Sequence, residues 1–252
     1  MDKTKPLVSV LLPVRSSSRY LPLCLKSLVK QSYKNIEIVA IDDHSKDNSF
    51  KILKEFARKD KRIRVYKNIK RYGAATTLNR LVKKAKAKFI AFMNSSDIAY
   101  VDRIKKQIQF ALKNPETVAV GSQCVFIDKD SKALGKSEFP HDNRFIYQSP
   151  LHGISMQFET VLINRTLLPK DVLKFDANSK PFIYSDVFIK LLPYGKFANL
   201  KKSLYLRRSN PNVYPSDLRK HILSLIKLWL KSMLDYDYRP SLRSLLLPLA
   251  RH

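Results

Sequence analysis

The sequence has few cysteines for its length and no long apolar segment. Only Cys24 and Cys124 occur in 252 residues, both in apolar stretches, so we expect reduced core thiols rather than a disulfide framework. No run approaches ~18 consecutive apolar residues, the length that a membrane-spanning helix needs. The short apolar run near the N-terminus lacks the small residues of a signal-peptide cleavage site. We interpret that run as a first strand and expect a cytoplasmic protein.

Acidic residues are also scarce. The sequence contains 21 Asp and Glu but 48 Lys and Arg, which gives a formal net charge of +27. A surface of this charge attracts polyanions or anionic lipid headgroups. Zinc-finger spacing, an aromatic RNA-binding signature and basic-zipper heptads are all missing, so no specific nucleic-acid partner is expected. A solvated, lysine-rich surface explains the charge equally well.

Strand and helix patterns alternate over the first 122 residues. Strand-like apolar runs, typical of strands buried on both faces, cover 7–14, 36–41, 62–66, 88–93 and 117–122. Apolar residues at helical spacing fill the segments between them, at 18–31, 48–60, 73–86 and 102–114. This alternation predicts an α/β fold with a parallel sheet built from right-handed crossovers.

The alternation ends near residue 122. Residues 123–140 are typical of a hairpin or a loop pair, and 141–185 show a mixed pattern. A short helix is then expected at 186–192. The segment 197–208 predicts a closing pair of strands.

The last segment, 216–252, combines an amphipathic helix with many cations. After a turn-rich break at 209–216, Ser216 is expected to cap the helix. Its apolar residues recur at helical spacing, and its cations fall between them: Leu218, Ile222, Leu225, Ile226, Trp229 and Met233, with Arg219, Lys220, Lys227 and Lys231. The helix is expected either to dock on the core or to lie on a membrane with its cations at the headgroups. The second alternative predicts peripheral contact with the inner membrane face.

Several stretches together resemble the family-2 glycosyltransferases, above all a small bacterial subgroup. They are VSVLLPV (8–14), LPLCLKSLVKQSYKNIEIVAIDDHSKDNS (21–49), the segment from Tyr72 to Pro115 that contains FIAFMNSSDI, and VAVGS (118–122). The similarity covers about residues 6–208. It implies a GT-A-type, Rossmann-like, mostly parallel α/β fold, a UDP- or GDP-linked sugar donor, Mg²⁺ or Mn²⁺, and inversion at the anomeric carbon. It also implies a nucleotide-sugar-binding half at 1–122 and an acceptor half at 123–208. Residues 209–252 lie outside the resemblance and are expected to form a separate basic, amphipathic tail.

Donor-binding residues are expected at the carboxyl ends of the first strands, where open α/β sheets bind ligands. Pro13 and Val14 end the first strand and match family residues that line the base and ribose pocket. Asp42 and Asp43 end the second strand. A carboxylate there can accept a hydrogen bond from the imino N–H of uracil or guanine. The alternative is that either aspartate caps the helix that starts near Asp47.

Four more residues are candidates for donor contacts. Arg15 either stacks on the base or contacts phosphate, or it is a solvated loop cation. Gly73 opens a helix whose free N–H groups suit a diphosphate, and Arg71 adds charge beside it. Asn79 matches a helix asparagine of the family near the metal motif, with a helix-to-strand tether as the alternative role.

The strand end at FIAFMNSSDI departs from the family pattern. The two acidic positions that hold the metal and the donor phosphates are Asn94 and Ser96 here, and only the trailing acid, Asp97, persists. We expect Asn94, Ser95 and Ser96 near the donor, and Ser96 and Asp97 as the ligands of any metal. Neutral oxygens lack the charge that offsets the dehydration of a hard cation, so Mg²⁺ or Mn²⁺ should bind weakly or not at all. Fixed arginines are the expected substitutes, with Arg207 the best placed.

The catalytic base is a second departure. The family carries an acidic residue at the start of a helix, and the matching stretch here is PFIYSDVFIKLL (181–192). One register places Tyr184 at that position, and a two-residue shortening places Asp186 there. Asp186 is the expected base, and Glu159 is the fallback.

These departures leave two hypotheses about function. The first is an active transferase that acts on a hydroxyl of a glycan or lipid-linked acceptor. The second is a non-catalytic relative that binds a nucleotide, a partner enzyme or the membrane surface.

Overall fold

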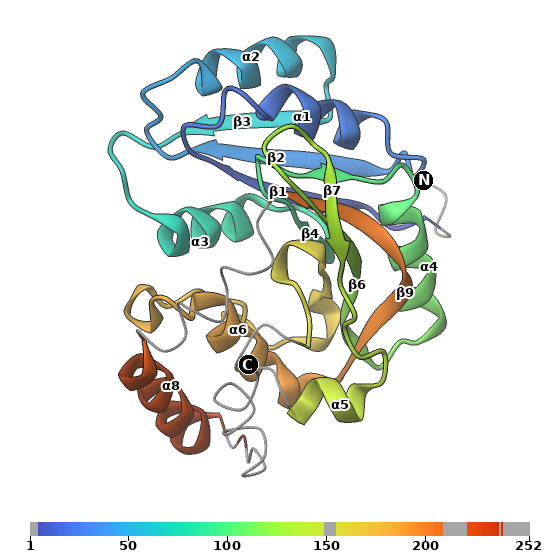
Figure 1. Ribbon diagram of the computed structural model, residues 1–252, viewed down its shortest axis with the longest axis vertical. Helices are drawn as coiled ribbons and strands as arrows, with labels where there is room; N and C mark the ends of the chain where they lie inside the picture. The colour runs from blue at the N-terminus through green and yellow to red at the C-terminus, as the bar shows by residue number, and fades with distance from the viewer. Residues whose placement is uncertain (1–4, 149–154, 209–220, 237, 239–252) are drawn as a thin grey trace.

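The first half of the chain forms four parallel strands with helices between them (Figure 1). Along the chain these elements are β1 (Val8–Val14), α1 (Leu21–Val29), β2 (Ile36–Asp42), α2 (Ser49–Lys59), β3 (Ile63–Lys67), α3 (Ala74–Lys84) and β4 (Phe89–Phe92). Strand β1 lies parallel to both β2 and β4, and β2 lies parallel to β3. The predicted α/β alternation is confirmed here, because every expected element forms at its place in the chain.

The computed structural model describes residues 5–148, 155–208, 221–236 and 238. Its second half contains β5 (Ile98–Ala99), α4 (Arg103–Lys113), β6 (Thr117–Ile127), β7 (Ala133–Lys136), α5 (Asn143–Gln148), β8 (Leu162–Asn164), α6 (Ile183–Leu191), β9 (Lys196–Arg208) and α8 (Ile222–Asp235). All strands join one curled sheet in the order β3-β2-β1-β4-β8-β6-β9-β5, with β7 paired to β6. Strand β8 is antiparallel to its neighbours β4 and β6, so the sheet is uniformly parallel only in its first half.

Three predictions for the second half were wrong in detail. The expected strand pair at 197–208 is one continuous strand, β9, which looked interrupted because Lys201 and Lys202 are exposed at its centre. Its register against β6 shifts near Ser122 and Gln123, as at a β-bulge, and the strand bends there. Strand β6 runs beyond the expected 122 to Ile127, and α6 begins at Ile183 rather than at 186.

Apolar side chains fill both faces of the sheet. In β1, Val8, Val10 and Leu12 join one buried cluster, whereas Leu11 joins the other. This burial on both sides explains the continuous apolar runs of the first strands. Cys24 and Cys124 are buried free thiols, as predicted.

Helix α8 packs against the rest of the fold through Leu228, and Leu225 and Trp229 lie partly buried beside it. The predicted cap at Ser216, the turn at 209–216 and the segment 239–252 lie outside the described residues. In the described part of the chain, no helix combines the length and apolar character needed to cross a bilayer.

Candidate functional site

The loops that follow β1 and β2 are joined into one rim by hydrogen bonds. The backbone N–H groups of residues 16–18 donate to the side chains of Ser45, Ser49 and Asp47 at 2.8–2.9 Å. The guanidinium of Arg15 donates to the Asp43 carbonyl at 2.8 Å. Arg15 is therefore anchored on the rim rather than freely solvated.

Asp43 fastens the loop between β3 and α3 to the end of β2. One carboxylate oxygen accepts from the Asn68 amide and the Tyr72 N–H, both at 2.8 Å, and the other accepts from the Gly73 N–H at 2.9 Å. Burial acts to raise the pKa of Asp43, but these hydrogen bonds outweigh it and hold the pKa below its usual value. The carboxylate is ionised at neutral pH and holds the backbone immediately before α3.

The N–H of Gly73 itself is used by Asp43, so the expected phosphate role of this helix start depends on the N–H groups that follow and stays a prediction. Gly73 has a φ of +84°, a left-handed conformation that favours glycine. Both the glycine and the carboxylate thus shape the tight entry into α3. A diphosphate at this place has to be held by side chains or by the following N–H groups.

Asp42, Val14 and Pro13 form the more buried part of the rim, at the ends of β2 and β1. Asp42 is fully buried, pairs in register with Val14, and accepts from the Ser45 N–H at 3.1 Å. Its other oxygen has no hydrogen-bond partner among the described residues. Val14 is buried and Pro13 half-buried beside this pair, so the structure brings the predicted residues of both strand ends together.

Two exposed cations flank Gly73. One is Arg71, as expected, and the other is Lys180, whose ammonium would lie 4.0 Å from a Cβ placed on Gly73. By contrast, Arg80 is occupied: it stacks 3.9 Å from the Tyr72 ring centroid and donates to Asn68 at 2.7 Å. Sequence reasoning missed Lys180 because it lies in a segment without a motif.

The amide of Asn79 holds the segment that carries Lys180. It donates to the Phe175 carbonyl and accepts from the Phe175 N–H, both at 2.8 Å. Both halves of the amide are used, so Asn79 acts as a tether, although to a loop rather than to a strand. A donor contact by Asn79 stays a prediction without support from this geometry.

The polar residues after β4 bind one another and β9. Asn94 is exposed, and its side-chain oxygen accepts from the N–H and the hydroxyl of Ser96 at 3.1 Å. Ser95 is buried, with its hydroxyl 2.7 Å from that of Ser17. The carboxylate of Asp97 accepts from the Tyr205 hydroxyl at 2.9 Å and from the Arg208 N–H at 2.8 Å.

Asp97 is a poor ligand for a metal in this setting. Only 1% of the residue is exposed, and burial raises its pKa to about 7 even though the Arg208 and Tyr205 bonds act to lower it. No cluster of three or more His, Cys, Asp and Glu occurs within the described residues. The residues at this strand end therefore fit Mg²⁺ or Mn²⁺ poorly.

Glu159 and Arg207 join Asp97 at this edge of the sheet. Glu159 lies on a short 3₁₀ helix, Phe158–Thr160, and is 8% exposed. The side-chain amide of Gln157 donates to the Glu159 carboxylate, and Arg207 donates to the side-chain oxygen of Gln157. Because Asp97 accepts from the N–H of Arg208, the residue that follows Arg207 in β9, these hydrogen bonds connect one guanidinium and two carboxyl groups to the same strand end.

Tyr184 faces this cluster. Its ring stacks on Phe158 with centroids 4.2 Å apart. Burial raises the pKa of Tyr184, with a further rise from Glu159 and an opposing effect from Arg207. The sequence left the position of the family base at either Tyr184 or Asp186, and of these two residues only Tyr184 stacks on Phe158 beside this cluster. A phenol with a raised pKa stays neutral and is unsuited to that role.

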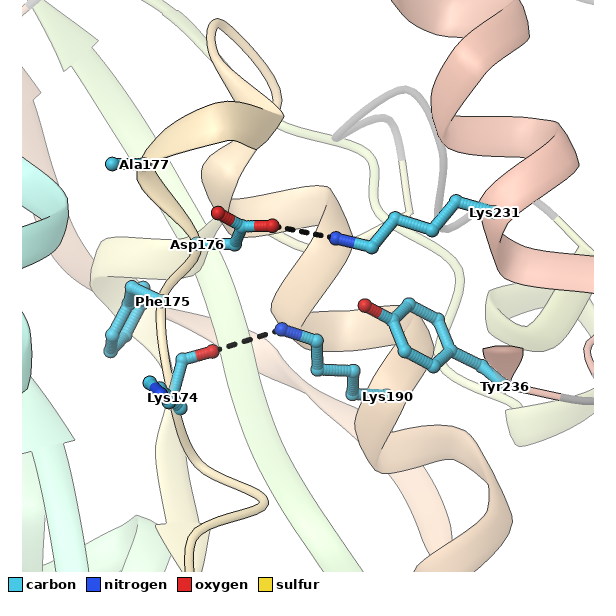
Figure 2. A pocket seen from close by; sticks show the side chains of 7 residues that line it. All are labelled: Lys174, Phe175, Asp176, Ala177, Lys190, Lys231 and Tyr236. Carbon is cyan, nitrogen blue, oxygen red and sulfur yellow. Dashed lines mark hydrogen bonds and ion pairs between the residues drawn. The ribbon is translucent and has the colours of Figure 1, made fainter. Parts of the chain in front are cut away.

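Asp186 instead connects α6 to α8. It is fully buried, with Lys190 at 2.7 Å and Lys231 at 3.3 Å from its oxygens, and it accepts from the Tyr236 hydroxyl at 3.0 Å. Figure 2 shows Lys190, Lys231 and Tyr236 converging on a surface pocket of about 470 Å³, where Lys231 also pairs with Asp176 at 2.7 Å. The contacts of Asp186 thus hold α8 against α6, and they do not support the base role that we expected for Asp186.

We predict that Asp186→Asn destabilises the docking of α8. The change leaves Lys190 without its counter-charge and weakens the hold on Lys231, so the free energy of unfolding should fall by roughly 2–4 kcal/mol. Urea unfolding measures this loss, and limited proteolysis should cut near α8 faster. Asp235→Asn, an exposed change on the same helix, is the control. Equal stability of the two variants would contradict the docking role.

A buried arginine supports the site from behind. Arg103 is fully buried and donates to the Phe92 carbonyl at 2.8 Å and to the Glu159 carbonyl at 2.9 Å. It also lies over the Tyr205 ring, 4.9 Å from the centroid, and burial lowers its pKa to about 10. Sequence reasoning missed it because it stands among the surface cations of RIKKQ.

Comparison with known proteins agrees with this architecture. The curated E. coli protein named UDP-Glc:alpha-D-GlcNAc-diphosphoundecaprenol beta-1,3-glucosyltransferase WfgD is 31% identical over 195 residues, which cover 77% of this chain and 72% of that protein. A crystal structure of S. aureus TarS 1–349 in complex with UDP superposes with a TM-score of 0.73 at 20% identity, covering 97% of this chain and 71% of that one.

A second solved structure is also similar. The mannosyltransferase PcManGT from Pyrobaculum calidifontis, in complex with GDP-Man and Mn²⁺, gives a TM-score of 0.72 at 15% identity, covering 98% of this chain and 69% of that one. At such identities the two structures show the fold alone, which confirms the GT-A-type α/β prediction. Across the curated relatives that it matches, the chain spans from 33% to 72% of the relative's length.

The family assignment rests on sequence. Residues 9–166, more than half of the chain, match the family described as glycosyl transferase family 2. The resemblance stated from the motifs alone is thereby confirmed, and the chain belongs to glycosyl transferase family 2.

Proposed function

We propose that this chain transfers a sugar from a nucleotide-sugar donor to a hydroxyl group of an acceptor, with inversion at the anomeric carbon. The observation that carries the proposal is the set of contacts at the ends of β4 and β9, where Asp97 accepts from the Arg208 N–H and Arg207 is linked through the Gln157 side chain to Glu159. Family membership supports a transferase, and the rim formed by Asp42 and Asp43 supplies a place for the nucleotide at the carboxyl edge of the sheet.

The reaction is a single displacement. The acceptor oxygen attacks the anomeric carbon in line, its bond to that carbon forms, and the bond to the diphosphate oxygen breaks. Glu159 takes the proton of the attacking hydroxyl, a step worth about 10²–10⁴-fold. We assign this role to Glu159 because the Gln157 side chain links it to Arg207 at the end of β9, whereas Asp186 is enclosed by lysines.

Charge on the departing diphosphate has to be stabilised by fixed groups. The solved Pyrobaculum mannosyltransferase contains Mn²⁺, but the residues after β4 fit a dication poorly here. We propose that Arg71, Lys180 and Arg207 provide this charge instead. Preorganised cations suit the task because they need no reorganisation as charge develops.

The names of the relatives suggest the substrate classes. The TarS structure holds UDP, the Pyrobaculum enzyme holds GDP-Man, and the name of the E. coli relative gives a lipid diphosphate as its acceptor. We propose a UDP- or GDP-linked donor and a lipid-linked glycan acceptor at the inner membrane face.

Calorimetry with UDP and GDP, with and without Mn²⁺, tests the proposal. We expect one nucleotide to bind without added metal, and Lys180→Ala to weaken that binding about tenfold, the cost of one hydrogen bond to a charged group. Lys170→Ala, another exposed lysine, should leave the affinity unchanged. If neither UDP nor GDP binds, the proposal is overturned.

Nucleotide release from UDP-glucose, UDP-N-acetylglucosamine and GDP-mannose distinguishes the two hypotheses. Release from one of these donors supports the transferase. If the chain binds a nucleotide but releases none from these three sugar donors, the result favours a non-catalytic relative. The neutral Asn94 and Ser96, in place of the acidic pair of the family, are the reason for this second hypothesis.

A further inference from the structure

Helix α8 is apolar on two opposite faces. On its inner face, Leu225, Leu228 and Trp229 pack on the core, and Leu228 is buried. Leu225 and Trp229 belong to the apolar pattern expected from the sequence, whereas Ile226 of the same pattern lies on the opposite, exposed face.

The outer face carries a second apolar stripe. Its residues follow one another at intervals of three and four positions, so they lie on one side of the helix. Their exposed fractions are 72% for Leu223, 46% for Ile226, 44% for Leu230 and 82% for Leu234. A surface helix normally presents polar residues at such positions, and a helix that is apolar all round is usually covered on every side.

Tyr238, which the structure describes after α8, lies on the docked side of the helix. The Tyr238 N–H donates to the Ser232 carbonyl at 3.1 Å, and its hydroxyl donates to the Tyr147 carbonyl at 2.7 Å. Tyr238 is buried by these contacts. The chain therefore leaves α8 toward its docked side and α5, away from the outer stripe.

Charge favours a lipid surface as the occupant. Lys227 is exposed on the same helix, and the whole chain carries a net charge of +27, which attracts anionic headgroups. Figure 1 places α8 on the outside of the molecule, at the opposite end of the long axis from α2. A membrane against α8 therefore leaves the end of the molecule around α2 in water.

We propose that the outer stripe of α8, formed by Leu223, Ile226, Leu230 and Leu234, inserts into the interface of an anionic bilayer, with the helix lying in the plane of the membrane. Leucine-rich faces of interfacial helices bind in this way, by buried apolar area together with attraction between cations and anionic lipid. The inference extends the proposed function, because it brings the second half of the chain to a lipid-linked acceptor.

Co-sedimentation of the full chain with vesicles tests the proposal. The probes are two kinds of vesicle. Neutral vesicles contain phosphatidylcholine alone, and anionic vesicles also contain about 30% phosphatidylglycerol, so that their surface carries a strong negative charge. The test variant replaces three leucines of the stripe by glutamine, which preserves helix propensity: Leu223→Gln, Leu230→Gln and Leu234→Gln. The control variant makes the same change at three exposed leucines elsewhere: Leu23→Gln, Leu112→Gln and Leu134→Gln.

We expect the wild type and the control to bind the anionic vesicles, and the test variant to bind at least about tenfold more weakly. The proposal is overturned if the test and control variants bind the anionic vesicles equally. It is also overturned if the wild type binds neutral and anionic vesicles equally, or binds neither. A wild-type dimer that light scattering finds dissociated in the test variant would overturn it too, because a second copy would then cover the stripe. Calorimetry with UDP and GDP on the same proteins reports separately whether the nucleotide site is intact.

Discussion

Glu159→Gln is expected to lower the turnover number by about 10²–10⁴-fold while leaving the affinity for the bound nucleotide within about twofold of wild type. The amide cannot accept the proton of the attacking hydroxyl, but it preserves the shape of the carboxylate and can still accept the bond from Gln157. The loss therefore falls on the chemical step. Nucleotide release from the preferred sugar donor gives the turnover number, and calorimetry gives the affinity.

Two further variants make this result specific. Glu55→Gln, an exposed change on α2, should leave both quantities unchanged. Asp186→Asn, assayed at a temperature where it remains folded, should retain most of its turnover because its partners are lysines of α6 and α8. If Asp186→Asn loses turnover and Glu159→Gln retains it, our assignment of the base is wrong.

Much of the first half could be predicted because its signals are local. Runs such as VSVLLPV are buried on both faces of the sheet, so their hydrophobic pattern alone identifies them. Asp42, Asp43 and Asp97 follow strand ends, and the parallel topology then places them on one edge. Family resemblance supplied the chemistry that periodicity could not.

The errors arise where distant segments decide the structure. Asp186 looked like a base because it opens a helix, but its partner Lys231 comes from α8, and no local pattern connects them. Likewise, the Asp43 carboxylate accepts from the N–H of Gly73, a contact between distant segments that no local pattern predicts. The outer stripe of α8 was hidden because one periodic pattern was assigned to one face, whereas the helix carries two.

The altered metal motif fits the charges that surround it. With Asn94 and Ser96 neutral, the strand end lacks the negative charge that would otherwise hold a dication. Burial raises the pKa of Asp97 to about 7, and the charge of Glu159 also acts to raise it. In the proposed function, the neutral Asn94 and Ser96 leave fewer carboxylates to compete with the donor diphosphate for Arg71, Lys180 and Arg207.

Arg103→Met should reduce the free energy of unfolding by about 2–4 kcal/mol. Methionine approximately fills the space of the arginine side chain. Because the substitution also removes a buried charge, it recovers part of the desolvation cost of the guanidinium. However, the carbonyls of Phe92 and Glu159 and the side-chain oxygen of Gln107 all lose a donor. Each buried acceptor left unpaired costs about 1–3 kcal/mol, so the loss outweighs the gain.

The same substitution should lower turnover as well as stability, because Arg103 joins the end of β4 to the backbone of Glu159. Without that link the carboxylate is no longer held at a fixed distance from Asp97, and a misplaced base loses much of its effect. Lys105→Met, an exposed change two residues along α4, should alter unfolding by less than about 0.5 kcal/mol. Urea unfolding and turnover, measured on both variants, separate the two effects. Stability of Arg103→Met equal to that of Lys105→Met would show that the buried guanidinium does not support the site.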